Sequence, residues 1–220
     1  MKVVIVGGVA GGATAAARIR RLDERAEVVV FERSGHVSYA NCGLPYYIGG
    51  VIEEEENLRL QTPESFWERF RVDIKVKHEV ISVDPKRKVV TVRNLTNDDV
   101  FEESYDKLLL SPGAKPTIPN VSGIDSDRIF TLRTVEDTLR IKKFVDEKKP
   151  RKAVIAGGGY IGIELAENLR ELGIEVTIVQ RPKQLMNPLD PDMAAFVHSE
   201  MRRHGVLAGG WRSRWPLPFP

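Results

Sequence analysis

The chain has 220 residues, of which 42% are hydrophobic and 29% are charged, and its formal net charge is +2. This composition is ordinary for a soluble globular protein, and the small net charge does not favour nucleic acid or an anionic membrane as a partner. No stretch approaches the roughly 20 apolar residues of a membrane span, and the N-terminus lacks the longer apolar core of a signal peptide. We therefore expect a cytoplasmic protein of one or two domains, with no nucleic-acid or membrane partner.

The sequence holds a single cysteine, Cys42. One cysteine excludes an internal disulfide framework and an internal Cys-x-x-Cys pair. If Cys42 does redox chemistry, its sulfur partner must come from outside the chain. That partner is then a small thiol, a persulfide, a peroxide oxygen or another subunit. We expect no metal site.

A strand–helix–strand pattern opens the chain. Lys2–Val6 predicts a buried parallel strand, residues 7–12 are rich in glycine, Ala13–Leu22 predicts a helix, and Glu27–Phe31 predicts a second strand that ends in Glu32. Glycines let the backbone and a helix N-terminus approach a pyrophosphate, and an acid at the end of the second strand accepts hydrogen bonds from a ribose diol. The pattern therefore predicts a dinucleotide-binding unit.

The glycine pattern of this unit is imperfect. In Gly-x-Gly-x-x-Gly the second glycine would fall at Val9, whereas Gly7 and Gly12 keep their places and Gly11 adds flexibility. A glycine motif alone also fits a tight turn in some other α/β protein. Strand, helix, second strand and acid together favour nucleotide binding.

The cysteine lies in the segment 38–50, Ser-Tyr-Ala-Asn-Cys-Gly-Leu-Pro-Tyr-Tyr-Ile-Gly-Gly, directly after this unit. Gly43, Leu44 and Pro45 are suited to start a helix just after the sulfur of Cys42. A helix N-terminus there would help to lower the pKa of a reactive thiol. We interpret Cys42 as a redox thiol beside a flavin.

The next stretch predicts one helix. Thr62 is suited to cap it and Pro63 to occupy its first turn. The spacing of Phe66, Trp67 and Phe70 predicts that all three pack in the core.

Residues 72–110 alternate in the manner of β-strands. We expect short antiparallel strands inserted into an α/β domain, followed by a buried strand at Lys107–Leu110. The closing turn at residues 111–114 either meets a cofactor or is only structural. Residues 116–127 are rich in Pro, Gly, Ser and Asp and predict a crossing segment, and Thr134–Lys148 predicts an amphipathic helix.

The opening unit returns from Lys152 onward. A strand precedes residues 157–162, which form a complete Gly-x-Gly-x-x-Gly, and a helix at Ile163–Leu172 follows. Glu175–Gln180 then corresponds to the second strand of the first unit, Glu27–Glu32, so that Gln180 takes the position of Glu32. Two such units with a thiol between them predict one site for FAD and one for NAD(P)H.

The second unit ends in an amide where the first ends in an acid. Gln180 occupies that position and Arg181 follows it. An acid would favour the free 2′-hydroxyl of NAD, whereas a nearby arginine can accommodate a 2′-phosphate, so NADPH or both cofactors are expected unless Arg181 points to solvent. Tyr160, Ile161 and Glu164 share one face of the helix, where Tyr160 either gates the nicotinamide slot or simply packs.

At this point the sequence resembles the pyridine nucleotide-disulfide oxidoreductases that have a single catalytic cysteine. Its motifs are most like those of coenzyme A-disulfide reductases and NAD(P)H-dependent persulfide reductases, with NADH oxidases and NADH peroxidases as further relatives. The resemblance rests on VIVGGVAGGATAAARIRRLDE, FER, SYANCGLPYYIGG, LQTPESF, ESYDKLLLSPGA and GGGYIGIELAENL, and it runs from Met1 to about Val206.

The resemblance implies a fold, a reaction and a set of site residues. The fold is α/β, with two Rossmann-like dinucleotide-binding units of the three-layer ββα type and a small inserted antiparallel sheet. NAD(P)H would reduce FAD, and FAD would reduce a mixed disulfide between Cys42 and coenzyme A. In the oxidase and peroxidase relatives the cysteine becomes a sulfenic acid instead. The complete family chain is expected to form a homodimer.

The site residues divide into two groups. The predicted cofactor residues are Gly7, Gly8, Ala10, Gly11, Gly12, Glu32, Arg33, Asn41, Val80, Ser111, Pro112, Gly113, Gly157, Gly159, Tyr160, Ile161, Gly162, Glu164, Gln180 and Arg181. The residues that the resemblance assigns to the coenzyme A path are Thr14, Arg18, Arg21, Ser38 and Asn41. Without the resemblance, the arginines would be interpreted as a solvated helix face. Arg71 is a candidate for a further basic residue, because Phe70 occupies the place where relatives carry one.

The expected domains are an incomplete FAD-binding domain at 1–115 that carries the redox cysteine, a crossing segment and helix at 116–150, and a truncated NAD(P)H-binding domain at 151–206. Residues 207–220 form an atypical tail, for which we expect no helix or strand. The tail suggests a frameshift or a truncation, because the family chain continues with a second FAD segment and a dimerisation domain. Two hypotheses therefore remain open: a flavin-dependent reductase, and a non-catalytic nucleotide-binding fragment.

Overall fold

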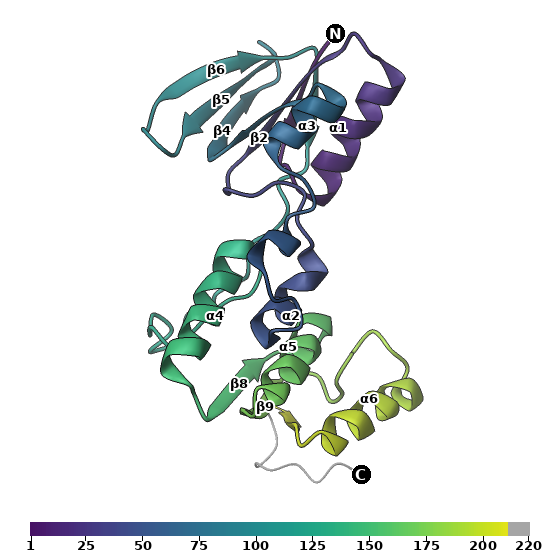
Figure 1. Ribbon diagram of the computed structural model, residues 1–220, viewed down its shortest axis with the longest axis vertical. Helices are drawn as coiled ribbons and strands as arrows, with labels where there is room; N and C mark the ends of the chain where they lie inside the picture. Colours follow the sequence, from purple (N-terminus) through teal and green to yellow (C-terminus); the bar gives the residue numbers. More distant parts are fainter. Residues whose placement is uncertain (211–220) are drawn as a thin grey trace. The chain divides into compact units, whose positions relative to one another are not determined.

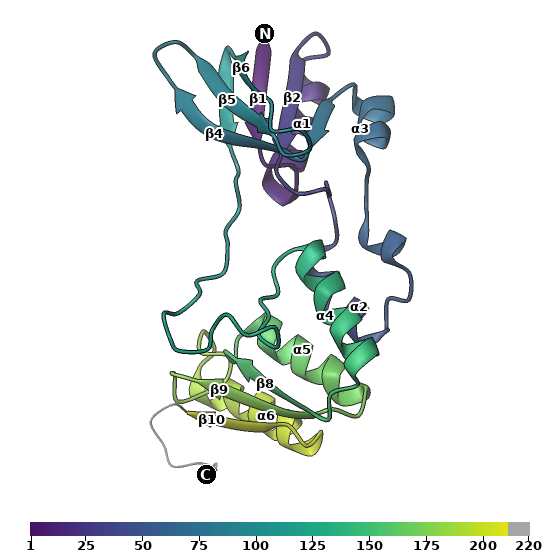
Figure 2. The same cartoon turned by 90° about the vertical axis from the view of Figure 1, so that its left-hand side faces the viewer.

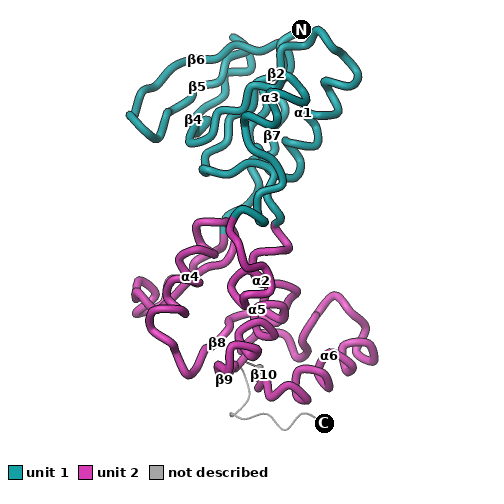
Figure 3. Tube along the Cα trace, viewed as in Figure 1, with its two compact units in different colours: residues 1–40, 56–115 teal, residues 41–55, 116–220 magenta. Residues whose placement is uncertain are grey.

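The computed structural model describes residues 1–210, which divide into two compact units. Unit 1 holds residues 1–40 and 56–115, and unit 2 holds residues 41–55 and the chain from residue 116 onward (Figure 3). Residues 41–50 of the cysteine segment, including Cys42, thus belong to unit 2 together with the second glycine motif, whereas residues 38–40 belong to unit 1.

Unit 1 is built on a parallel sheet with the strand order β3-β2-β1-β7. The strands are β1 (Lys2–Val6), β2 (Glu27–Glu32), β3 (Asp73–Val76) and β7 (Lys107–Leu110). In β1, Val4 pairs with Val29 on one side and with Leu108 on the other. Because β1 and β2 are buried on both faces, their sequences are nearly continuous runs of β-branched and aromatic residues.

Two different layers cover the two faces of this sheet (Figure 1). One layer holds the helices α1 (Ala10–Leu22) and α3 (Pro63–Phe70), whose Ala13, Ala16 and Phe66 pack with Val3 and Ile5. The other is an antiparallel sheet of β4 (His78–Asp84), β5 (Val89–Asn94) and β6 (Val100–Ser104). This is the predicted three-layer ββα arrangement.

Two details of unit 1 differ from the sequence-based expectations. The start of the stretch at residues 72–110 is not antiparallel, because β3 pairs with β2 in the parallel register Val30↔Ile74. Trp67 does not pack in the core: its side chain is exposed, and the guanidinium of Arg71 lies 5.7 Å from its ring centroid. The predicted start of α3 is confirmed, since Thr62 forms a capping box with Ser65.

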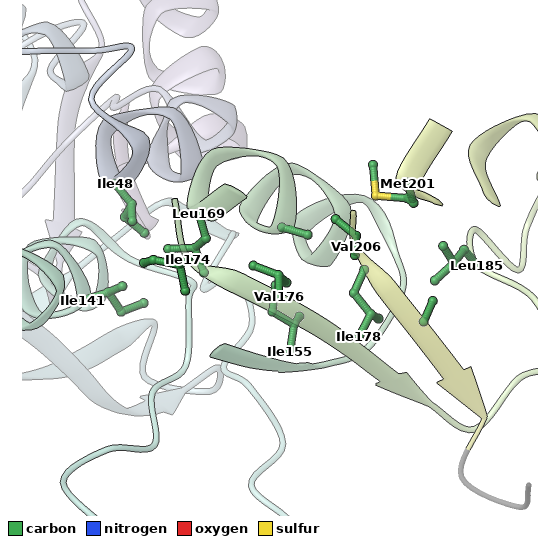
Figure 4. Close-up of a cluster of buried hydrophobic side chains, with 12 residues drawn as sticks. Ile48, Ile141, Ile155, Leu169, Ile174, Val176, Ile178, Leu185, Met201 and Val206 are labelled. Atoms are coloured by element: carbon green, nitrogen blue, oxygen red, sulfur yellow. The ribbon is translucent and has the colours of Figure 1, made fainter. Parts of the chain in front are cut away.

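Unit 2 contains a second parallel sheet with the order β10-β9-β8. Its strands are β8 (Lys152–Ala156), β9 (Glu175–Gln180) and β10 (Leu207–Gly210), and its helices are α2 (Leu44–Gly49), α4 (Val135–Lys148), α5 (Tyr160–Glu171) and α6 (Pro191–Arg203). Figure 2 shows α5 alongside β8 and β9. Residues from the sheet and from all four helices form one buried cluster, most of which is labelled in Figure 4.

The expectation that residues 207–220 form no regular structure is wrong at its beginning. Residues 207–210 form β10, which pairs in parallel with β9 and completes a three-stranded sheet. Val206 and Ala208 are buried in the core of unit 2, so this part of the sequence belongs to the fold. The rest of the predicted tail, residues 211–220, lies outside the described residues.

Candidate functional site

The glycine turn of unit 1 connects β1 to α1 without room for side chains. Gly7 has a φ of +97°, and a Cβ there would lie 2.1 Å from the carbonyl oxygen of Ser111. A Cβ at Gly12 would lie 1.7 Å from the carbonyl oxygen of Gly7. These two glycines are therefore required by close packing of the turn against α1 and against the chain that follows β7.

The first two residues of α1, Ala10 and Gly11, are exposed. No acidic residue lies in the first turn, and no side chain caps the helix at Val9. The positive end of the helix dipole is thus left without a negative side chain of its own. Such a terminus, next to a glycine turn, suits the pyrophosphate of a dinucleotide.

Glu32 closes the first turn at the end of β2. Its carboxylate is buried and accepts hydrogen bonds from the backbone N–H groups of Gly8 and Ser34, each at 2.7 Å. Each carboxylate oxygen keeps a second lone-pair direction, which can accept from a ribose hydroxyl. The predicted acid therefore lies beside the predicted turn.

The loop after β7 lies against the same turn. The backbone N–H of Ser111 donates to Val6 at 2.8 Å, and a Cβ at Gly11 would lie 2.4 Å from the Ser111 hydroxyl oxygen. Pro112 and Gly113 follow and are exposed. The carboxyl ends of β1 and β7 thus bring two predicted cofactor segments together.

Two other predicted cofactor residues of unit 1 have their own partners. Arg33 lies 3.6 Å from the carboxylate of Glu79, and Val80 packs against the core cluster that contains Phe31 and Val92.

Unit 2 repeats the geometry of the first turn. Gly157 has a φ of +120°, and a Cβ at Gly162 would lie 2.0 Å from the carbonyl oxygen of Gly157. The N–H of Gly157 donates to Val179 at 2.8 Å, as the N–H of Gly7 donates to Phe31 at the same distance. The internal repeat inferred from sequence is therefore a structural repeat.

The repeat also explains Val9, which stands where unit 2 has Gly159. A Cβ at Gly159 would have nothing within 4 Å, and its φ of −87° is accessible to any residue. Val9 has a φ of −100° at the matching position before α1. The middle glycine is thus not required by the fold, and its replacement leaves the turn intact.

The end of β9 takes the place of the end of β2. The side-chain oxygen of Gln180 would lie 2.3 Å from a Cβ at Gly158, so Gln180 packs against the turn as Glu32 does in unit 1. Arg181 is exposed, and so are Tyr160 and Ile161 at the start of α5, while Glu164 is half-buried. An exposed fraction of 63% excludes a core-packing role for Tyr160.

Cys42 lies at the centre of a short 3-10 helix, Asn41–Gly43, that leads directly into α2. Its thiol is free and exposed, and the predicted helix start at Leu44 is confirmed. Burial raises the pKa of the neighbouring Tyr46 phenol, and the negative charges of Glu164 and Glu167 raise it further. Tyr46 therefore remains a neutral hydroxyl at physiological pH.

The residues assigned to the coenzyme A path belong to both units. Thr14, Arg18 and Arg21 are exposed on α1. Ser38 has a φ of +46°, and Asn41 is the first residue of the 3-10 helix that precedes α2. The sequence did not predict that the intervening arginine of α1 has a structural role. Arg20 donates to the carbonyl groups of Phe70 and Arg71, at 2.7 and 2.9 Å, and so ties α1 to the end of α3.

The described residues also limit other kinds of site. Among residues 1–210 no group of three or more His, Cys, Asp or Glu side chains could hold a metal ion. None of the helices described is both long enough and apolar enough to cross a membrane.

The sequence of residues 1–208 matches the family described as pyridine nucleotide-disulphide oxidoreductase, and the chain belongs to this family. It is 44% identical over 200 residues to the coenzyme A disulfide reductase of Staphylococcus haemolyticus. The aligned residues cover 91% of this chain and 45% of the relative. The chain thus spans less than half the length of this curated relative.

Two solved structures have the same fold. The reduced CoADR-RHD of Bacillus anthracis is 52% identical, with a TM-score of 0.93 over 95% of this chain and 38% of that one. The NAD-dependent persulfide reductase of A. fulgidus is 34% identical, with a TM-score of 0.90 over 96% of this chain and 40% of that one. The resemblance inferred from the sequence motifs is confirmed at the level of the family and the fold.

Proposed function

We propose that the protein takes part in a flavin-dependent reduction in which electrons pass from NAD(P)H to Cys42 and on to coenzyme A disulfide or a persulfide. The observation that carries the proposal is one exposed thiol in a chain that also has two glycine turns of matching geometry. The family and the coenzyme A disulfide reductase relatives support the same reaction class.

The first glycine turn is proposed to hold FAD. Gly7 and Gly12 allow the tight turn that leads into α1, the start of α1 presents a positive dipole end, and Glu32 lies beside the turn, where it could bind a ribose. When bound there, FAD would supply two-electron transfer between a nicotinamide and a sulfur–sulfur bond. In this assignment residues 1–115 serve the flavin and residues 151–206 serve NAD(P)H, with 116–150 as the connection.

Cys42 is proposed to be the residue that exchanges disulfides. Its thiolate attacks one sulfur of coenzyme A disulfide, so that a Cys42–coenzyme A disulfide forms, the original sulfur–sulfur bond breaks and one coenzyme A thiolate leaves. Two electrons from NAD(P)H, with a proton, then release the second coenzyme A thiol and restore Cys42.

The exposed face of α1 is proposed to bind the phosphates of coenzyme A. Thr14, Arg18 and Arg21 lie four and three residues apart, so they share one side of the helix. Arginine guanidinium groups form strong charge-assisted hydrogen bonds with phosphate oxygens. Ser38 and Asn41 are proposed to take part in coenzyme A binding as well.

The second glycine turn is proposed to accept NADPH as well as NADH. Gln180 lacks the charge that would repel a 2′-phosphate, and the exposed Arg181 follows it directly. Tyr160, exposed at the start of α5, is proposed to cover the nicotinamide site.

The experiment that tests the proposal is reconstitution of the purified chain with FAD, followed by anaerobic addition of NADPH. We expect a yellow protein whose flavin absorbance bleaches on reduction, and a colourless apoprotein without added flavin. A protein that binds FAD and does not bleach with NADPH or NADH would contradict the proposed electron route. A protein that holds no flavin would support the alternative of a non-catalytic nucleotide-binding fragment.

A further inference from the structure

α2, the helix that follows Cys42, packs against α5, the helix that follows the second glycine turn. Within unit 2, α2 also packs against α4. Ile48 of α2 is completely buried, in one cluster with Ala166 and Leu169 of α5 and Ile141 of α4 (Figure 4). The contacts of α2 with α5 and α4 therefore hold α2, and with it the turn that carries the thiol.

Gly49 of α2 lies directly against the side chain of Asn168 of α5. A Cβ at Gly49 would lie 2.2 Å from the side-chain oxygen of Asn168 and 2.7 Å from its Cβ. Asn168 thus occupies the space that any larger residue at position 49 would need. Because interiors are closely packed, a contact of this kind fixes the distance between two helices.

Asn168 is itself held in place. Its side chain is 2% exposed, and its Nδ2 donates to the carbonyl oxygen of Glu164 at 2.7 Å. A buried amide that lost this acceptor would pay a desolvation cost, so the side chain keeps one orientation. α5 begins at Tyr160, directly after the glycine turn. The same helix therefore borders the proposed dinucleotide site and contacts α2, the helix that follows Cys42.

We propose that Asn168 is a positioning residue for Cys42: by filling the space beside Gly49 it fixes α2 on α5 and thereby orients the thiol. The proposal rests on the proposed function, in which Cys42 reacts with coenzyme A disulfide. Asn168 acts through α2 rather than on the sulfur. A reaction that needs an oriented thiol depends on this contact, whereas one that needs only an exposed thiol does not.

The test compares two reactions of Cys42, which is the only cysteine of the chain, by intact mass. In Asn168→Ala and in Gly49→Ala we expect the rate of adduct formation with coenzyme A disulfide to fall about tenfold, because a displaced nucleophile loses orientation. The rate with iodoacetamide, a small reagent, is expected to change by less than about twofold. Glu171→Ala, an exposed change on the same helix, is the control and is expected to match the original chain.

The double variant Gly49→Ala with Asn168→Ala provides the decisive comparison, because the smaller residue at 168 leaves room for the methyl group at 49. We expect it to react with coenzyme A disulfide faster than Gly49→Ala alone, whereas independent effects would add. Amide hydrogen exchange in residues 44–50 is expected to rise in both single variants and to fall again in the double variant.

Other outcomes overturn the proposal or separate it from the proposed function. Unchanged hydrogen exchange in α2, equal losses in both reactions, or additive effects in the double variant would each contradict the positioning role. If Gly49→Ala fails to fold, Asn168→Ala alone tests the positioning role, through its two reaction rates and its hydrogen exchange in residues 44–50. If the original chain forms no coenzyme A adduct, the proposed function fails, and hydrogen exchange in α2 still decides the role of Asn168.

Discussion

The two glycine turns show which residues of the motif the fold itself demands. Gly12 and Gly162 each face a backbone carbonyl that leaves no room for a methyl group, whereas Gly159 faces open space. The same difference accounts for Val9 in the first turn. A motif read from sequence treats its glycines alike, and only the packing shows that they differ.

The first prediction compares two glycines of one motif. Gly162→Ala is expected to lower the free energy of unfolding by about 1–3 kcal/mol, because the methyl group would overlap the carbonyl of Gly157. Gly159→Ala is the matched control and is expected to change it by less than about 0.5 kcal/mol. Urea denaturation followed by circular dichroism measures both values. Equal effects of the two substitutions would contradict the described packing.

The second prediction concerns cofactor preference. Arg181→Ala is expected to weaken NADPH binding about tenfold and to leave NADH binding nearly unchanged, because only NADPH has a 2′-phosphate for the guanidinium. Isothermal titration with each nucleotide measures the two affinities. Lys183→Ala removes another exposed positive charge nearby and serves as the control. A similar loss for both nucleotides would show that Arg181 does not discriminate between them.

Single residues were predicted from sequence with uneven success. The pairing of glycine turn and acid was recoverable, because Gly7, Gly12 and Glu32 have fixed roles in a strand–helix–strand pattern. Trp67 was assigned to the core because helical spacing does not show whether a neighbouring layer reaches that position. No sequence pattern indicated a role for Asn168, because that role depends on its contact with Gly49, which is more than 100 residues earlier in the chain.

At the scale of elements, α6 is attached to the loop after β9 by a histidine. The backbone N–H of Leu185 donates to Nε2 of His198 at 3.0 Å, and Leu185 is completely buried. Burial lowers the pKa of His198, and the positive charge of Arg202 lowers it further. The neutral ring is therefore the form that the folded state stabilises, since a protonated Nε2 could not accept this hydrogen bond.

The third prediction follows from that lowered pKa. The unfolded chain binds a proton at His198 near the ordinary value of about 6.5, while the folded chain does not, so the free energy of unfolding falls as pH drops below about 6.5. The loss is complete once pH is below the folded-state pKa. His198→Gln keeps a polar side chain that does not titrate in this range, so its stability is expected to fall less between pH 7 and pH 5. Urea denaturation at these two pH values measures the difference, and an identical fall in the variant would contradict the assignment.

Most elements were predictable because their hydrophobic patterns are local. The capped helices α3 and α4 begin at Pro63 and Val135. Thr62 was predicted as a cap, and Thr134, the observed cap of α4, was predicted as the first residue of that helix. The errors fell on β3 and β10, which were assigned to an antiparallel layer and to an irregular tail. Both are edge strands whose membership depends on a single neighbour, β2 or β9, and a short stretch of sequence does not encode that pairing.

At the scale of the whole molecule, the chain repeats one device in two units. Each unit places a glycine turn between a parallel strand and a helix and sets a polar side chain beside it, Glu32 in unit 1 and Gln180 in unit 2. The repeat was visible in the sequence, whereas the packing of residues 41–50 within unit 2 was not. Cys42 therefore lies in the same unit as the helix of the second turn, where Gly49 contacts Asn168.

The central claim is that Cys42 exchanges disulfides with coenzyme A, and the intact mass of the purified chain tests it most directly. After incubation with coenzyme A disulfide, we expect a mass increase of one coenzyme A per chain. The increase should disappear with dithiothreitol and should not occur in Cys42→Ser. An increase that matches one oxygen atom instead would indicate the sulfenic acid chemistry of an oxidase or peroxidase. A chain that keeps its original mass while Cys42 remains reactive toward iodoacetamide would contradict the account.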